Sequence, residues 1–160
     1  MATRRQRQTA MRHLHESLVD LIAITNQPYR DDALLAEAGI KLDRALFPLL
    51  VGIRRFGPIG VVDLAERAGR DHTTVSRQVA KLADLGLVER RPSPSDRRIK
   101  EAVVTDEGRR ATDALDAARN RLNAPVLGHW SDRDLLELDR LMRRYVDDMI
   151  ALRGADHESP

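Results

Sequence analysis

The segment from Val61 to Val104 constrains the fold more than any other part of the chain. It begins with a short run of helical periodicity, Val61–Ala68, which Gly69 ends, and a second run, His72–Leu85, follows almost at once. Two helices joined by so short a glycine-containing turn are typical of a helix-turn-helix. Asp71 is a good N-cap for the second helix, because its carboxylate can accept hydrogen bonds from amides two or three residues further on.

Two β-prone stretches come directly after these helices. Leu87–Pro92 is short and β-prone, Ser93–Asp96 has the composition of a turn, and Ile99–Val104 alternates enough to be the returning strand. A hairpin placed immediately after a helix-turn-helix is the arrangement of a winged helix. We therefore predict a mainly α (α+β) fold, a winged helix-turn-helix with a two-stranded β wing.

Helical periodicity also predicts helices on both sides of this segment. Glycine and proline mark their ends, since neither continues a helix easily. Ser131 resembles the first residue of a capping box, with Asp134 in place of glutamate. The predicted helices are Thr9–Gln27 (stopped by Pro28), Asp31–Ala38 (Gly39), Leu42–Arg55 (Gly57-Pro58), about 105 to Asn123 (Pro125) and about 131 to Leu152.

Composition narrows the class of protein. With 42% apolar but only 3% aromatic residues in 160 positions, the core must be built from aliphatic side chains, which favours packed helices. The absence of cysteine excludes disulfides, thiolate metal sites and cysteine redox chemistry within the chain. No run of about 18 apolar residues is present, and no signal-peptide pattern follows the basic start. We expect a cytoplasmic protein without a membrane partner.

Charge is distributed unevenly along the chain. Between Arg67 and Lys100 there are nine basic and four acidic residues, a local net charge of +5. Because the whole chain has a net charge of only +2, the remainder carries −3. A cationic segment in a mildly acidic protein suits the docking of a polyanion on one face, and here that segment coincides with the predicted winged helix.

The second helix of the predicted helix-turn-helix has one apolar face and one polar face. At 100° per residue, Val75, Val79 and Leu82 point to the core. The opposite side carries short hydroxyls followed by cations, which suits a helix that enters a DNA groove. An ordinary amphipathic helix with a solvated polar face is the alternative. The candidate DNA contacts on this helix are Thr73, Thr74, Ser76, Arg77 and Lys81.

The predicted hairpin tip carries Asp96, Arg97 and Arg98. An arginine there can enter a minor groove, where narrow A·T tracts concentrate negative potential, and the neighbouring carboxylate can hold it extended. A solvated turn rich in arginine and aspartate is the alternative reading. The remaining candidates, for contacts to phosphate, are Arg70, Arg90 and Arg91.

Two continuous stretches carry a resemblance to a known family. They are LAERAGRDHTTVSRQVAKLADLGLVERR (64–91) and PSPSDRRIKEAVVTDEG (92–108). Their T-V-S-R, G-L-V-E-R-R, D-R-R and T-x-E-G elements resemble those of MarR-family (multiple antibiotic resistance regulator) transcription factors. The likeness extends more loosely from Leu42 to the C-terminus, and the first helix matches only by its amphipathic pattern.

The resemblance implies a homodimeric repressor of a pseudo-palindromic operator in double-stranded DNA, hence a nucleoid-associated protein. The implied parts are an N-terminal dimerisation arm (1–41), a DNA-binding lobe (42–108) and C-terminal dimerisation helices (109–160). In the family's wing motif an aspartate orients an arginine, and these positions correspond to Asp96 and Arg98. Family members often release DNA when a small, frequently phenolic, ligand binds, but no residue here marks such a site. The apolar faces of the first and last helices could instead complete the core of a monomer.

Other classes of function find less support in the sequence. His13 and His15 point about 200° apart on a helix, so they do not form a metal pair. The nucleotide-binding, serine-hydrolase and zinc-protease motifs are absent, and we expect no catalytic residue, metal or cofactor. A protein-docking winged helix and a ligand-binding or enzymatic helical protein remain as rival hypotheses.

Overall fold

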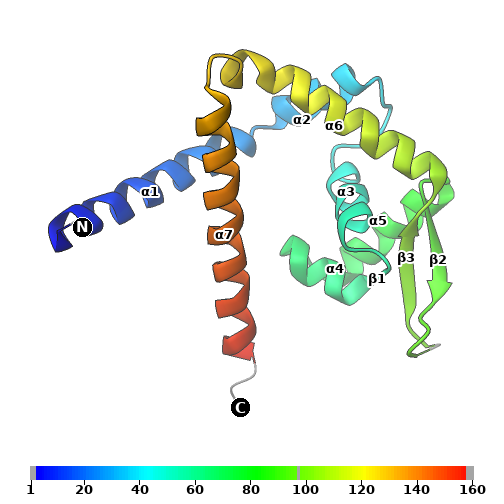
Figure 1. Ribbon diagram of the computed structural model, residues 1–160. Coiled ribbons are helices and arrows are strands. Elements are labelled where there is room, and N and C mark those ends of the chain that lie inside the picture. Colours follow the sequence, from blue (N-terminus) through cyan, green and yellow to red (C-terminus); the bar gives the residue numbers. More distant parts are fainter. Residues whose placement is uncertain (1–2, 97, 158–160) are drawn as a thin grey trace. The chain divides into compact units, whose positions relative to one another are not determined.

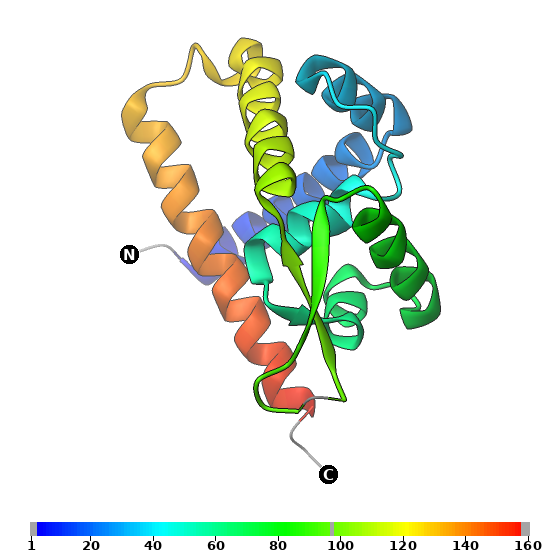
Figure 2. The same ribbon diagram turned by 90° about the vertical axis from the view of Figure 1, so that its right-hand side faces the viewer.

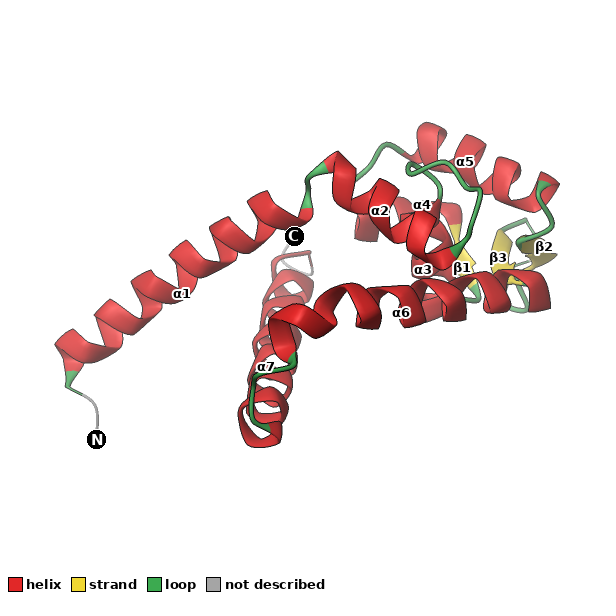
Figure 3. Cartoon of the chain, turned by 90° about the horizontal axis from the view of Figure 1, so that it is seen from above, coloured by secondary structure: helices red, strands yellow, loops and turns green. Residues whose placement is uncertain are grey.

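A computed structural model describes residues 3–96 and 98–157 of the chain (Figure 1). The chain divides into two compact units, Met1–Arg119 and Asn120–Pro160. Helices account for most of the chain, while the strands are confined to one small sheet (Figure 3). None of the helices in the described ranges is long and apolar enough to cross a membrane.

The first two helices begin earlier than predicted. Helix α1 spans Arg4–Thr25 because Thr3 caps it: the Gln6 amide donates to the Thr3 hydroxyl at 3.3 Å, and the Thr3 amide donates to the Gln6 side chain at 2.8 Å. Helix α2 spans Pro28–Ala38, with proline in its first turn. Proline is well placed there, since the first amides of a helix have no partner within the helix. Pro28 therefore starts a helix as well as following one.

The central lobe has the predicted order of elements. Its second and third helices, Val61–Ala68 and His72–Asp84, end within one residue of the prediction. Helix α3 begins five residues later than expected, because the Asp43 carboxylate accepts from the Ala45 amide at 2.8 Å and closes a turn before it. The elements are α3 (Phe47–Phe56), β1 (Ile59–Gly60), α4 (Val61–Ala68), α5 (His72–Asp84), β2 (Val88–Pro92) and β3 (Lys100–Val104).

The β wing is a hairpin that belongs to a three-stranded antiparallel sheet of order β1-β3-β2 (Figure 2). Strands β2 and β3 pair from Val88 opposite Val104 to Pro92 opposite Lys100, as the predicted hairpin requires. Strand β1 was not predicted. It adds only Ile59 and Gly60, and two residues are too few for alternation to show in the sequence.

The core of the lobe is aliphatic, as the composition predicted. Val75, Val79 and Leu82 of α5 are completely buried, which confirms the predicted inner face of this helix. They pack with side chains from the rest of the lobe, namely Leu46, Leu49, Leu50, Ile53, Ile59, Leu64, Ala65, Val88, Ala102 and Val104. The core thereby fixes which side of α5 is presented to solvent.

The join between the wing and the next helix explains the T-x-E-G element. The Thr105 hydroxyl donates to the Gly86 carbonyl at 2.7 Å and accepts from the Gly108 amide at 3.0 Å. A Cβ on residue 108 would lie 2.0 Å from the Leu87 carbonyl oxygen and 2.6 Å from Val104 Cγ2. Glycine is therefore required at this close approach of helix α6 (Asp106–Leu127) to the base of the wing.

The last two helices are longer than predicted. Helix α6 spans Asp106–Leu127 and contains Pro125, so the expected end at Asn123 is wrong. Pro125 lies in the last turn, where it removes one backbone hydrogen bond without ending the helix. Helix α7 spans Asp132–His157, and its predicted cap is present: the Asp134 amide donates to the Ser131 hydroxyl at 3.1 Å.

Candidate nucleic-acid interface

The N-terminus of α5 is organised by Asp71. Its carboxylate accepts from the amides of Thr73 at 3.2 Å and Thr74 at 2.8 Å, as predicted for an N-cap. The Thr74 side chain and then these two amides lower the pKa of Asp71 to about 2 from 3.8. Since both amides and the Thr74 side chain interact with Asp71, an approaching phosphate or base would meet the Thr73 hydroxyl at this end of the helix.

This cap makes a testable contribution to stability as a function of pH. A carboxyl whose pKa is lower in the folded than in the unfolded state stabilises the fold above its unfolded pKa. That stabilisation is lost as the pH falls from about 3.8 through about 2. Asp71→Asn retains a capping oxygen but does not titrate. In urea unfolding, we expect the stability difference between the wild type and this variant to be constant above pH 5 and to change between pH 4 and 2. A difference independent of pH would contradict this role of Asp71.

The outer face of α5 presents a ridge of polar side chains to solvent. Thr73, Thr74, Arg77 and Lys81 are exposed, and Ser76 is partly buried. Neither Arg77 nor Lys81 has an ion-pair or hydrogen-bond partner within the part of the chain that the structure describes. We call Thr73, Arg77 and Lys81 the α5 ridge; its cations are available to an external partner.

The tip of the wing is held by Asp96. Its carboxylate accepts from the Arg98 backbone amide at 2.9 Å, and its carbonyl accepts from the Ile99 amide at 2.9 Å. Asp96 thus constrains the backbone that carries Arg98 rather than contacting the guanidinium. The Arg98 side chain is exposed, and the candidate Arg97 lies outside the described residues.

The three candidates for phosphate contact all interact with groups of the protein, which the sequence did not indicate. Arg70 donates to the Ala45 carbonyl at 3.2 Å, and Arg90 donates to the Ser76 carbonyl at 3.4 Å. Arg91 pairs with the Glu89 carboxylate. A guanidinium has five N–H donors, so each retains donors for a further partner.

A hollow of about 380 Å³ lies between the wing and the start of α4. It brings together Arg90 from β2, Arg98 from the turn and Lys100 from β3, with Asp63 as the one carboxylate in its lining. The sequence indicated Lys100 only as one of the basic residues of the cationic segment. Among the predicted site residues, Thr73, Arg77 and Lys81 form the α5 ridge and Arg90 and Arg98 line this cationic hollow. Arg70 and Arg91 lie on neither feature.

A winged helix with an exposed cationic helix beside a basic wing defines the class of helix-turn-helix transcriptional regulators. Residues 42–100 match the model of the MarR family. An uncharacterized HTH-type transcriptional regulator of Bacillus subtilis, YxaD, is 32% identical over 103 residues, which are 64% of this chain and 72% of YxaD. The chain belongs to the MarR family, whose members are transcriptional regulators.

Solved structures agree with the fold. A MarR transcriptional regulator from Methanosarcina mazei Go1 superposes with a TM-score of 0.67 at 18% identity, covering 88% of this chain and 99% of that one. CouR from Rhodococcus jostii RHA1, solved with p-coumaroyl-CoA bound, has a TM-score of 0.53 at 24% identity, covering 69% and 76%. These likenesses confirm the mainly α winged-helix architecture that the sequence predicted.

Proposed function

We propose that this protein is a homodimeric repressor that binds a pseudo-palindromic operator, with α5 in the major groove and the wing at the minor groove. The observation that carries the proposal is the α5 ridge, whose two cations have no partner within the described residues. The adjacent wing contributes three further basic side chains, Arg90, Arg98 and Lys100, around its hollow. Two-fold dimers place half-sites about 10 base pairs apart, which gives an operator of roughly 16–20 base pairs.

The side chains on the two features take different roles in this proposal. Arg77 reads a base edge in this proposal, since arginine binds guanine in a bidentate manner, while the hydroxyls at the start of α5 meet bases or phosphates. Lys81 contacts phosphate, as do Arg70, Arg90 and Arg91 with the donors that their internal hydrogen bonds leave over. The hydroxyl-bearing contacts are Thr73, Thr74 and Ser76.

Arg98 is the wing residue that we expect to enter the minor groove, with Asp96 holding its backbone at 2.9 Å and Arg97 beside it in sequence. Arg98→Ala should weaken operator binding, and the loss should be largest for operators with A·T-rich flanks, where the groove potential is most negative. Fluorescence anisotropy with matched A·T- and G·C-flanked duplexes measures this. Operator affinity unchanged by the substitution would remove Arg98 from the interface.

Dimerisation is supported by the apolar side chains that the terminal helices leave exposed. Helix α1 has no buried residue, and α7 has none among its described side chains. We assign dimerisation to residues 1–41 and 109–160, flanking the DNA-binding lobe at 42–108, because pairing across a two-fold axis covers such faces. Sedimentation velocity should give about twice the 18.0 kDa chain mass. The exposed residues include Met11, Leu14, Leu21, Ile22, Leu135, Leu138, Leu141 and Met149.

A small-molecule effector, phenolic or similar, has a candidate site in a second hollow of about 420 Å³. It is lined by Gly39–Leu42 at the end of α2, by Leu85 and Leu87 after α5, and by Glu107, Arg110, Ala111 and Ala114 of α6. We call it the α2–α6 hollow. It supports the proposal because Leu85, the residue that directly follows α5, lines it, so a ligand there can act on the DNA-reading helix. The fold neighbour CouR was solved with p-coumaroyl-CoA bound.

Salt dependence tests the DNA-binding proposal before the operator is known. Each phosphate neutralised by a lysine or arginine releases counterions, so log K should fall by about 0.9 for each contact per tenfold rise in salt. We expect genomic DNA fragments to bind strongly at low salt and to be released steeply as salt rises. A protein-docking winged helix would show no such retention, and that outcome would reject the proposal. Sequencing the retained genomic fragments would then identify the operator, and with it the place in the nucleoid where the protein binds.

A further inference from the structure

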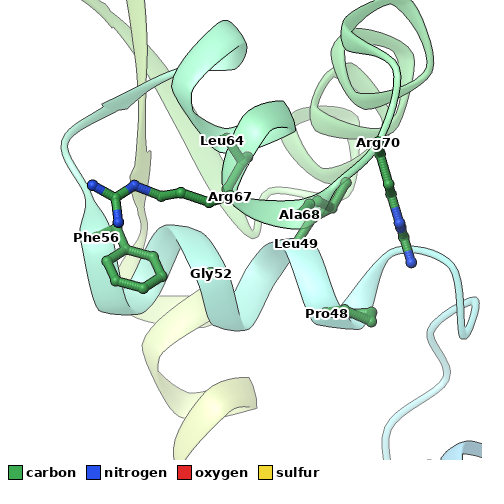
Figure 4. A pocket seen from close by; sticks show the side chains of 8 residues that line it. All are labelled: Pro48, Leu49, Gly52, Phe56, Leu64, Arg67, Ala68 and Arg70. Atoms are coloured by element: carbon green, nitrogen blue, oxygen red, sulfur yellow. The ribbon is translucent and has the colours of Figure 1, made fainter. Parts of the chain in front are cut away.

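Arginines at several places in this chain are held by other groups of the protein. Figure 4 shows one of them beside the pocket between α3 and α4, where the Arg67 guanidinium carbon lies 4.6 Å from the centre of the Phe56 ring. Three arginines in the first turn of α1 differ. The side chains of Arg4, Arg5 and Arg7 are exposed, and none has a hydrogen-bond or ion-pair partner among the described residues. We call these three residues the α1 arginine cluster.

The cluster lies in a stretch of chain without negative charge. Between Met1 and His15 there are four arginines and no aspartate or glutamate. The fourth arginine, Arg12, lies 3.9 Å from the first acidic residue of the chain, Glu16. The cluster is therefore a second cationic surface, separate in sequence from the winged helix.

The position of the cluster is unfavourable for the helix that carries it. The start of a helix has a partial positive charge, which favours acidic side chains and disfavours basic ones. Helices α6 and α7 each have two acidic residues in their first turn, whereas α1 has none. Residues that break a local rule of stability without gain to the fold often serve function. Here a partner that supplies negative charge would offset the cost.

The surface consists of side chains rather than of free backbone amides. The Gln6 amide already donates to the Thr3 hydroxyl, and the Thr3 amide donates to the Gln6 side chain. At about 100° per residue, the three arginines are spread over about 160° of the helix circumference. No apolar residue occurs among them between Arg4 and Thr9, whereas a helix that lies on a membrane needs an apolar face beside its cations. The arrangement suits a phosphate polymer better than a lipid surface.

We propose that the α1 arginine cluster binds phosphates of double-stranded DNA, without reading sequence, beyond the contacts made by the α5 ridge and the wing. Charge complementarity with a polyanion carries the inference, and the choice of DNA rests on the proposed DNA-binding function. Helix α1 has 22 residues and is therefore about 33 Å long, close to one turn of B-DNA. The arm can carry the cluster to phosphates outside the operator.

Titration of the full-length 15N-labelled protein with a short duplex of unrelated sequence locates the contact. We expect saturable amide shifts at Gln6 and Gln8, and the same shifts in the double variant Arg77→Ala/Lys81→Ala, whose α5 ridge lacks its cations. Shifts at Gln6 and Gln8 that disappear in the double variant, or that never occur, would overturn the proposal. Shifts at Gln6 and Gln8 without any on α5 would instead contradict the proposed reading by α5 and leave the α1 contact standing.

A charge-matched pair of variants measures the contribution of the cluster. In the test variant all three arginines of the cluster are replaced by glutamine. The control makes the same replacement, with the same change of net charge, at three arginines of α7 that each pair with a carboxylate of that helix: Arg140, Arg143 and Arg144. With a duplex of about 60 base pairs, about three times the proposed operator, log K of the test variant should fall less steeply with log salt, by about 0.9 for each lost phosphate contact. Equal slopes for the test and control variants would overturn the proposal.

Two further measurements examine the other partners that a cationic arm could have. If the cluster pairs with acidic side chains of a second copy of the chain, the test variant should dissociate in sedimentation velocity while the control keeps the oligomeric state of the wild type. That result would overturn the proposal; we expect both variants to sediment as the wild type does. Vesicles of phosphatidylglycerol and phosphatidylcholine should release the wild type at lower salt than the duplex does, and vesicle binding that persists at the salt that releases the duplex would also overturn it.

Discussion

Gly108→Ala is expected to lower the free energy of unfolding by about 3 kcal/mol, the upper end of what overpacking typically costs. The added Cβ would lie 2.0 Å from the Leu87 carbonyl oxygen, and a backbone atom cannot move aside as a flexible side chain can. Alanine also favours a helix over glycine by about 1 kcal/mol, so any loss measured comes in spite of better helix propensity. Urea unfolding followed by circular dichroism at 222 nm measures the change.

Gly60→Ala is the matched control for this prediction. A Cβ on residue 60 would have only ordinary contacts, 3.7 Å from Asp63 Oδ2 and from Ile99 Cγ2, and the backbone φ of −67° suits any residue. Alanine caps a helix less well than glycine, so we expect a loss of about 1 kcal/mol or less. If the two variants unfold at the same urea concentration, the close approach at Gly108 does not limit stability.

Arg77→Ala is expected to reduce operator affinity by about 1–3 kcal/mol, the value of a bidentate contact to a base, which is roughly 5- to 150-fold. The loss should be confined to sequences with the preferred base at one position of each half-site, because the other bases never made the contact. Anisotropy titrations against an operator and its single-base variants separate this base-specific loss from a general one.

Lys81→Ala provides the comparison on the same face of α5, one turn further along. As a phosphate contact it should weaken all duplexes alike and reduce the salt slope by about 1 for each subunit. A uniform loss from Arg77→Ala as well would make Arg77 a second phosphate contact and would leave base reading to Thr73, Thr74 and Ser76.

The elements whose signals are local could be predicted from the sequence. Helices α4 and α5 were placed within a residue, because glycine after each run and the Asp71 cap mark their ends. The buried face of α5 followed from the 3.6-residue period, and the exposed ridge followed from the buried face. The candidate site on α5 was therefore accessible to sequence reasoning, since one helix determines the side on which all its members lie.

The site on the wing could be predicted only in part. Asp96 was expected to orient the Arg98 side chain, but the hydrogen bond that its carboxylate accepts comes from the Arg98 backbone amide. Turn composition does not distinguish amide from guanidinium. The internal partners of Arg70 and Arg90 lie 25 and 14 residues away in sequence. Contacts between residues so far apart produce no periodic pattern in the sequence, so the sequence did not indicate that these arginines are hydrogen-bonded within the protein.

The sequence alone determined the order of helices and hairpin, the aliphatic core and the polar face of α5, because each depends on residues a few positions apart. Tertiary structure decided the pairing of β1 with β3, the passage of α6 through Pro125 and the need for glycine at 108. It also created the pocket between α3 and α4, whose walls come from two helices. The physical reason is that a helix pattern records which face is apolar, whereas close approach between elements depends on how they pack in three dimensions.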